Sequence, residues 1–387
     1  YEQMKALLDL STVYGFDENL WHNYLTFILL TNENSFSMTS EKVGANDGTV
    51  NHFAKADFKV FKHLFDFDFS AIERDLEIDC FSTVCHYKAI GKKERMYNKN
   101  VSEKVQAVSR QIEQAEDENE IFKIITDFYK AYGVGMFGLN KAFRIKAVTN
   151  GVEFLPVNNT EQVLLKDLVG YEIQKKQLVD NTEAFIKGLP ANNVLLFGDA
   201  GTGKSSAVKA IANEFAPEGL RLVEVKKNQL YQIPDLMDKL AANPLKFILF
   251  IDDLSFTAND DNFAALKAIL EGSVGGRAQN IAVYATSNRR HLIKETLSDR
   301  TGDDIHEADT RQELMSLSAR FGLTVTFQRP EKARFETILE ELAKQHNIQM
   351  PTEQLLLKAE AFALRAGGRS PRVAKQFIEQ CEAGVQK

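Results

Sequence analysis

The stretch Val194–Ser206 reads VLLFGDAGTGKSS and decides the fold of the chain. Its apolar first residues, Val194–Phe197, suit a buried parallel strand, and they run directly into the pattern G-x-x-x-x-G-K-S. Apolar residues then recur at i, i+3, i+4 and i+7 from Val208, which predicts a helix with one buried face. A strand, a glycine-rich loop and a helix in this order predict a site for a nucleoside triphosphate.

The loop supplies the residues that are expected to bind the phosphates: Gly198, Asp199, Ala200, Gly201, Thr202, Gly203, Lys204, Ser205 and Ser206. In such a loop the backbone N–H groups wrap the polyphosphate, the lysine reaches the β and γ phosphates, and the serine hydroxyl coordinates Mg²⁺. Lys204 and Ser205 take these two roles, with ATP and Mg²⁺ as the predicted cofactors. A glycine-rich turn ending in a solvated lysine is the weaker alternative, because the flanking strand and helix both fit.

A second part of the site is predicted at Asp252-Asp253, where the apolar run Phe247–Ile251 ends. An open α/β sheet places its catalytic groups at the carboxyl ends of its strands. Asp252 is expected to hold Mg²⁺, directly or through water, and Asp253 to polarise the attacking water. The alternative, two aspartates that cap the next helix, is weakened by the phosphate loop upstream.

The bulk composition bounds the class of protein. A chain of 387 residues with 44% hydrophobic residues has material for two or three domains with their own cores. A net charge of −7 gives no overall attraction to nucleic acid or to an anionic membrane, so a nucleic-acid partner is not indicated by charge. Three cysteines without C-x-x-C spacing argue against a disulfide framework or structural zinc, and short apolar runs argue against a membrane span. A cytoplasmic protein is expected.

Three domains are predicted along the chain. Residues 1–158 show helical apolar spacing and many phenylalanines, which predicts a mainly helical N-terminal domain that ends near the hairpin signal Asn150-Gly151. Residues 159–328 alternate strands with helices and predict a parallel, doubly wound sheet. Its five expected strands are Val194–Phe197, Leu222–Val225, Phe247–Ile251, Ile281–Ala285 and Leu323–Phe327. Residues 329–387 predict three helices, the last with Ser370 as N-cap.

Five motifs in a fixed order resemble the AAA+ ATPase family over roughly residues 165–387. They are the phosphate loop, the Asp252-Asp253 strand, the strand ending in Ala285–Asn288, Arg320-Phe321-Gly322, and the helix start Pro371-Arg372. The resemblance implies a five-stranded parallel P-loop sheet with helices on both faces, a C-terminal helical lid and ATP hydrolysis.

The resemblance also implies roles for five further residues. Val169 and Gly170 match the segment that contacts adenine, and Asn288 matches the sensor that orients the attacking water. Arg372 matches the lid sensor of the γ-phosphate. Arg320 matches the arginine finger that completes the site of a neighbouring subunit, in a Ser-x-Arg-Phe-Gly setting similar to that of the Holliday-junction branch-migration motor.

More closely, Asp252–Phe256, Ala285–Leu292 and Ser316–Leu323 resemble a bacterial ATP-binding AAA+ family catalogued as domain of unknown function 815. That resemblance extends more weakly into the N-terminal domain at Gly133–Phe143. The resemblance implies ATP hydrolysis and does not indicate the macromolecular substrate.

Some assignments stay open at this stage. Arg300 rivals Arg320 for the finger role, and a local ion pair is the other alternative for Arg320. Many AAA+ members have Glu where this chain has Asp253, which implies slow hydrolysis as one option. Tyr231 matches a pore residue poorly, because its segment lacks the glycine of protein-threading members and carries Pro234, so a buried or packing tyrosine is favoured.

Three functions are compatible with these features. The favoured one is a homo-oligomeric ATP hydrolase, a hexamer among the options, that remodels an unknown macromolecular partner through its N-terminal domain. The first alternative is a nucleic-acid loader or remodeller. The second is a slow ATP-dependent switch or scaffold without motor activity.

Overall fold

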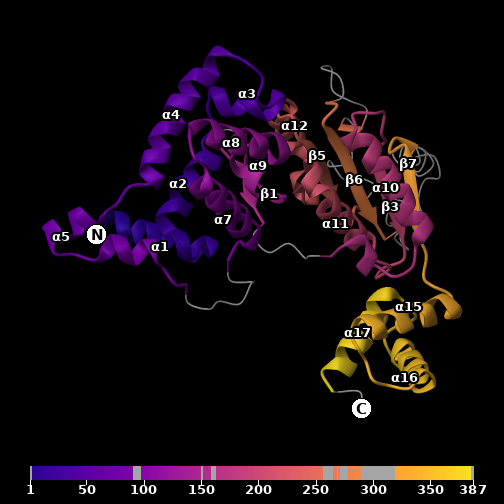
Figure 1. The fold of residues 1–387 in the computed structure, drawn as a ribbon. Coiled ribbons are helices and arrows are strands. Elements are labelled where there is room, and N and C mark those ends of the chain that lie inside the picture. The colour runs from indigo at the N-terminus through magenta and orange to yellow at the C-terminus, as the bar shows by residue number, and fades with distance from the viewer. Residues whose placement is uncertain are drawn as a thin grey trace. The chain divides into compact units, whose positions relative to one another are not determined.

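The computed structural model describes residues 2–89, 97–149, 151–157, 163–255, 265–267, 269–270, 278–288 and 319–384. The chain divides into two compact units (Figure 1). The N-terminal unit consists of Tyr1–Phe143, Leu155–Thr160 and Ala216–Arg221, and the C-terminal unit of Arg144–Phe154, Glu161–Phe215 and Leu222–Lys387. The predicted domain boundaries at 158 and 328 stay predictions. Among the described helices, none is long and apolar enough to cross a bilayer.

The N-terminal unit is helical, as predicted. Its helices are α1 (Glu2–Tyr14), α2 (Leu20–Thr31), α3 (Ser35–Val43), α4 (Thr49–Phe65), α5 (Ser70–Leu76), α6 (Cys80–Cys85), α7 (Lys99–Gln114), α8 (Glu118–Tyr132) and α9 (Gly135–Leu139). Apolar faces at helical spacing meet in one core, which includes Leu25, Val105 and Ile125. The phenylalanines of α4 differ in exposure. Phe58 and Phe65 are buried in this core, whereas 66% of Phe53 is exposed.

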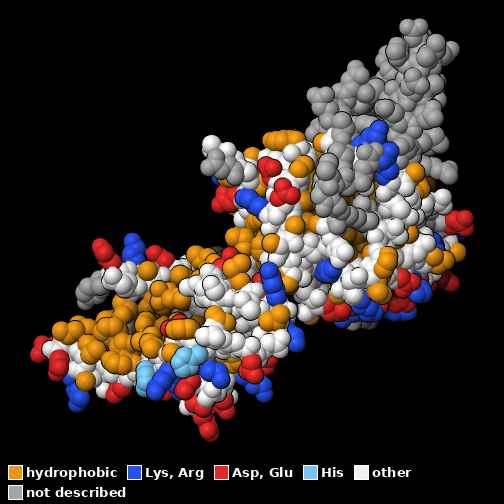
Figure 2. Space-filling view, turned by 90° about the horizontal axis from the view of Figure 1, so that it is seen from above, with side chains coloured by type: hydrophobic (Ala, Val, Ile, Leu, Met, Phe, Trp, Pro, Cys, Tyr) orange, Lys and Arg blue, Asp and Glu red, His pale blue; other side chains and the backbone are white. Residues whose placement is uncertain are grey.

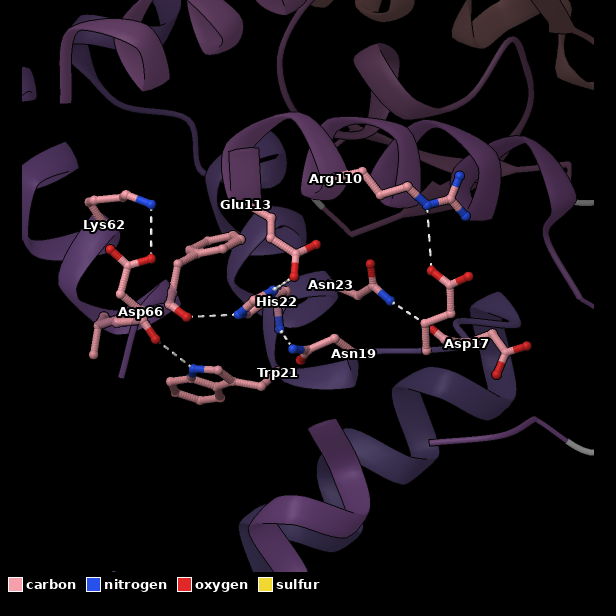
Figure 3. A network of polar contacts seen from close by, with 12 residues as sticks. Asp17, Asn19, Trp21, His22, Asn23, Lys62, Asp66, Arg110 and Glu113 are labelled. Carbon is pink, nitrogen blue, oxygen red and sulfur yellow. Dashed lines mark hydrogen bonds and ion pairs between the residues drawn. The ribbon is translucent and has the colours of Figure 1, made fainter. Parts of the chain in front are cut away.

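Two neighbouring side chains fasten α2 to the end of α4 (Figure 3). Trp21 Nε1 donates to the carbonyl oxygen of Leu64 at 2.9 Å, and His22 Nε2 lies 2.8 Å from that of Phe65. Carbonyls in the last turn of a helix lack intrahelical donors, so these two bonds satisfy groups that would otherwise need water. The His22 ring also packs on the Phe65 ring, with 4.5 Å between their centroids. The carboxyl end of α4 is thereby fixed against α2.

The sheet contains the predicted parallel core. Its strands are β1 (Ala142–Val148), β2 (Gly151–Pro156), β3 (Val194–Gly198), β4 (Leu220–Glu224), β5 (Lys246–Ile251), β6 (Ile281–Ser287) and β7 (Leu323–Phe327). They lie in the order β2-β1-β4-β5-β6-β3-β7, and β3 pairs in parallel with both β6 and β7. The predicted P-loop architecture is confirmed, but within the described residues the sheet has seven strands rather than five. The hairpin β1–β2 adds to the edge of β4, which would otherwise present unpaired backbone groups.

Helices complete the C-terminal unit. In the part of this unit that the structure describes, they include α10 (Glu172–Ile186), α11 (Lys204–Phe215), α12 (Ile233–Ala241) and the lid helices α15 (Lys332–Gln345), α16 (Thr352–Arg365) and α17 (Pro371–Glu382), with 3-10 turns at Leu165–Asp167 and Lys227–Gln232. The predicted lid therefore forms, around a core that includes Phe335 and Phe377. Ser370 caps α17 as expected, accepting from the Val373 N–H. The prediction of a buried Tyr231 is wrong, since 65% of this side chain is exposed.

Arg221 draws the start of β4 into the N-terminal unit. Its guanidinium is fully buried and donates to four backbone carbonyls, those of Tyr132, Phe137, Ala216 and Leu220, at 2.6–2.9 Å. These bonds supply acceptors for a cation that burial would otherwise penalise heavily. Burial still lowers the pKa of Arg221, to about 10. A segment far along the chain is thus part of the helical unit, which a contiguous N-terminal domain does not include.

Lys104 lies beside this arginine. Its Nζ donates to the Gly138 carbonyl oxygen at 2.7 Å and sits 4.5 Å from the centre of the Tyr132 ring. Burial lowers the pKa of Lys104 to about 7, and repulsion from Arg221 and Lys141 contributes to the shift. In the folded N-terminal unit the Lys104 amine therefore loses its proton near neutral pH.

This lysine makes stability depend on pH. Unfolding returns Lys104 to its ordinary pKa of 10.5, so between about pH 7 and 10.5 the unfolded chain binds one more proton than the folded chain. We expect stability to rise with pH across this window, by at most about 1.4 kcal/mol per pH unit from Lys104. Lys104→Met should remove that share, measured as urea midpoints at pH 7 and pH 9. An equal pH dependence in both proteins would contradict the assignment.

Candidate nucleotide-binding site

The phosphate loop joins β3 to α11 and is shaped by its glycines. Gly198 has φ +133°, and a Cβ there would lie 2.1 Å from the Phe327 carbonyl oxygen. Only glycine fits this close approach of β3 and β7. Gly201 has φ +77° and packs against the start of α17, where Arg372 N–H donates to the Gly201 carbonyl oxygen at 3.1 Å. The loop delivers the N-terminus of α11, whose free N–H groups favour an anion.

Lys204 opens α11 and is almost fully buried, with 5% of its surface exposed. Its Nζ donates to the carbonyl oxygens of Gly198 and Asp199 at 3.0 and 2.7 Å, and to Asn288 Oδ1 at 2.9 Å. Burial lowers the pKa of this amine, while the carboxylates of Asp199, Asp253 and Asp252 act in the opposite direction. The ammonium is thus held at the floor of the loop, close to the strand-end carboxylates.

Asp252 gathers hydroxyl groups around one carboxylate oxygen. Its Oδ1 accepts from Ser205 Oγ at 2.6 Å and from Thr286 Oγ1 at 2.5 Å. The two residues predicted to bind the metal, Ser205 and Asp252, are therefore adjacent. Thr286 was not predicted as a site residue, although the sequence held a signal: it lies near the end of β6, the strand between β3 and β5. Parallel strands that are neighbours bring their carboxyl ends to one edge.

Asp253 is held in the left-handed backbone region, with φ +52°. Its N–H donates to Thr286 Oγ1 at 2.9 Å, and its Oδ1 accepts from Asn288 Nδ2 at 2.8 Å. Aspartate and asparagine adopt this conformation more readily than longer side chains. The local backbone thus gives a physical reason for Asp at a position where many AAA+ proteins have Glu.

Two cavities flank the loop. One of about 500 Å³ is lined by Val169 and Gly170, the predicted adenine contacts, and by Arg372 from the lid. The other, of about 310 Å³, is lined by residues 200–206 and by Asp252, Asp253, Asn288 and Arg372. The structure therefore brings the predicted loop, strand-end, sensor and lid residues around one region. The larger cavity also includes residues without a sequence signal, among them Tyr171, Ile338 and His346.

Arg320 lies away from this cluster. It precedes β7, whose first residue Leu323 pairs with Val194, whereas the loop begins at the opposite end of the same strand pair, where Phe327 pairs with Gly198. The two ends of this strand pair are four residues apart, which corresponds to about 13 Å along the strands. Arg320 therefore does not join its own chain's phosphate loop. Its rival Arg300 and the basic residues 289–291 lie outside the described residues.

The sequence matches the family model described as "Protein of unknown function (DUF815)" over residues 139–385. The chain belongs to this family. The match begins just before β1 and covers the phosphate loop, the strand-end aspartates and the lid. The predicted relation to DUF815 is thereby confirmed.

Outside DUF815, the chain is similar to proteins that share only part of its length. The replication factor C large subunit of Staphylothermus marinus is 34% identical over 119 residues, which is 28% of this chain and 27% of that protein. The Holliday junction branch migration motor RuvB of Thermotoga maritima aligns over 56% of this chain and 63% of its own, with 18% identity and a TM-score of 0.39. A point variant of that RuvB aligns over the same shares at 19% identity, also with a TM-score of 0.39. The chain thus spans about a quarter of the curated relative and under two thirds of these RuvB chains.

The donor set of this DUF815 member fits Mg²⁺ and a polyphosphate. Ser205 and Asp252 offer hard oxygen ligands, which Mg²⁺ prefers to bind together with phosphate oxygens and water. The buried Lys204 and the N-terminus of α11 supply the positive potential that phosphates need. Asp199 is itself occupied elsewhere, because its Oδ2 accepts from the Arg329 N–H at 2.8 Å.

Proposed function

We propose that the chain binds ATP with Mg²⁺, hydrolyses it, and uses the nucleotide cycle to remodel a macromolecular partner. The observation that carries the proposal is the convergence of Lys204, Asp252, Asp253 and Asn288 at one edge of the sheet, joined by side-chain hydrogen bonds of 2.8–2.9 Å between Lys204, Asn288 and Asp253. The phosphate-loop motif, together with the partial similarity to a replication factor C large subunit, supports an ATPase in general terms. The partner and the work done on it are the finer part of the proposal.

Each residue has a role that its position supports. The loop N–H groups and Lys204 bind the phosphates, and Ser205 with Asp252 would hold Mg²⁺, which supplies charge neutralisation when bound. Asp253 accepts the proton of the attacking water, and Asn288, already bonded to Asp253, orients that water. Arg372 lines both cavities and is positioned to reach the terminal phosphate.

Hydrogen bonds connect the lid to the phosphate loop. Arg329 donates its N–H to Asp199 in the loop and its Nη1 to the Gly367 carbonyl oxygen just before α17. Arg372, in the first turn of α17, donates its N–H to Gly201. A change in the loop on phosphate binding therefore acts directly on the lid. We propose that this connection couples nucleotide state to movement in a homo-oligomer, with Arg320 acting on the neighbouring subunit.

Asp253 provides the test of hydrolysis. Asp253→Asn keeps the shape and tolerates φ +52°, but it loses the basicity that accepts a proton. We expect it to bind ATP with unchanged affinity and to hydrolyse it about 10²- to 10⁴-fold more slowly, measured by phosphate release and calorimetry. Asp253→Glu should not exceed the wild-type rate, because the longer side chain fits this backbone less well. Unimpaired turnover of Asp253→Asn would contradict the assignment of Asp253 as the base that accepts the proton of water.

Stimulation of the ATPase separates the functional alternatives. Faster hydrolysis with an unfolded protein supports remodelling of a protein partner, whereas faster hydrolysis with DNA supports a nucleic-acid loader. A slow rate that neither changes supports the ATP-dependent switch.

A further inference from the structure

The N-terminal unit carries an apolar groove that the nucleotide site does not use. The groove has a volume of about 480 Å³ and lies between the junction of α2 with α3 on one side and α4 on the other. Ile28, Leu29 and Phe36 line it from the first side. Figure 2, seen from above relative to Figure 1, shows hydrophobic side chains gathered on the surface of the N-terminal unit.

One face of α4 forms the long wall of the groove. Its lining residues are Val50, Phe53, Ala54, Asp57, Phe58, Val60 and Phe61. These positions follow the spacing of a single helical face and extend over about three turns, or about 16 Å. A groove of this length along a helix suits an amphipathic helix, which places apolar side chains at i, i+3 or i+4, and i+7. A compact small molecule would leave most of it uncovered.

The wall leaves large apolar surface in water. Phe53 is 66% exposed and Val60, which also lines the groove, is 57% exposed. A partner that covers these side chains removes their apolar surface from water, so the two residues have the character of binding anchors. The wall is also firmly placed, because Trp21 and His22 fasten the end of α4 to α2. A partner therefore finds the groove already formed.

Asp57 sets the charge of the partner. It is the one charged side chain among the described residues that line the groove, and it lies midway along the wall between Phe53 and Phe61. Within the described residues, no hydrogen bond or ion pair is formed by its carboxylate. A lysine or arginine facing Asp57 would pair with it, whereas a carboxylate there would be repelled.

We propose that this groove binds an amphipathic helix of a partner protein that presents apolar side chains in the i, i+3 or i+4, i+7 pattern and a lysine or arginine against Asp57. The proposal names a class of partner and does not depend on ATP hydrolysis. Apolar anchors supply the affinity, and the pairing with Asp57 fixes the register and excludes acidic helices.

The test uses the full chain and a phage library of helical peptides about 16 residues long, which matches the length of the wall. Enriched peptides are expected to share the apolar spacing and one basic position, and to bind in fluorescence anisotropy. Phe53→Ser and Val60→Ser should each weaken binding by roughly tenfold or more. Asp57→Lys should reject the basic peptide and accept a copy in which the basic residue is replaced by glutamate. That reversal of preference identifies the contact itself.

Matched controls separate this surface from the rest of the molecule. Leu357→Ser alters a similarly exposed side chain on the lid, 74% exposed, and should leave peptide binding unchanged. Lys204→Ala should also leave it unchanged, so failure of the ATPase proposal does not affect this one. Enrichment without the helical spacing, or equal binding by the Phe53 variant, would overturn the proposal. So would an affinity that is insensitive to Asp57, self-association abolished by Phe53→Ser, or binding of the groove to phosphatidylcholine vesicles.

Discussion

Lys204→Ala is expected to weaken ATP binding from about 30-fold to several thousand-fold, which corresponds to ~2–5 kcal/mol for a buried charge pair that loses one partner. Lys204 is 5% exposed and donates to three oxygens at the floor of the loop. In the proposed complex the same ammonium faces the terminal phosphates, where a charge-assisted bond in a dry site is strong. Isothermal calorimetry with ATP and Mg²⁺ measures the loss.

The control for this variant is Lys176→Ala on α10. Lys176 is 74% exposed and pairs with Asp180 one turn away, so removing it alters a surface charge only. It should bind ATP like the wild type, and both variants should unfold at similar temperatures. Near-normal affinity in Lys204→Ala would mean that the phosphates are held elsewhere in the chain.

Local sequence was enough to predict the centre of the site. The phosphate loop, its flanking strand and helix, and the aspartates after Phe247–Ile251 each carry their signal within a few residues. The alternation of strands with helices predicts a parallel sheet, and the structure confirms this parallel core, although the sequence pattern did not give the order of its strands. Strands β1 and β2 are neighbours at the place where the Asn150-Gly151 signal predicts a hairpin, but turn chemistry does not indicate which edge of a sheet a hairpin joins.

The rest of the site depends on contacts between distant segments. Tyr171 and His346 line the larger cavity from the start of α10 and from the lid, and neither stands in a motif. Tyr171 also has φ +59°, a conformation that sequence patterns do not indicate for tyrosine. The burial of Arg221 could not be predicted from the sequence for the same reason, because its four carbonyl acceptors become adjacent only when the N-terminal unit folds. Exposure of Phe53 likewise follows from how α4 packs, since its neighbours in sequence are buried and exposed alike.

Arg320→Ala is expected to bind ATP like the wild type and to hydrolyse it about 10³- to 10⁵-fold more slowly. The physical reason is its position at the end of the β3–β7 pair opposite the phosphate loop. In the proposed homo-oligomer Arg320 acts on the site of a neighbouring subunit, and a guanidinium placed on the γ-phosphate stabilises the charge of the transition state more than that of bound ATP. Calorimetry and steady-state phosphate release measure the two quantities separately.

Mixing two inactive variants tests whether Arg320 acts in trans. In an oligomer of Arg320→Ala with Asp253→Asn, some interfaces join an intact Asp253 site to an intact Arg320 from the neighbour, so partial activity should return. The wild-type rate per subunit should also rise with protein concentration as subunits assemble. Normal hydrolysis by Arg320→Ala would rule out the finger role. A rate per subunit that stays constant from dilute monomer upward would favour a switch that works as a single chain, because no site would then depend on its neighbour.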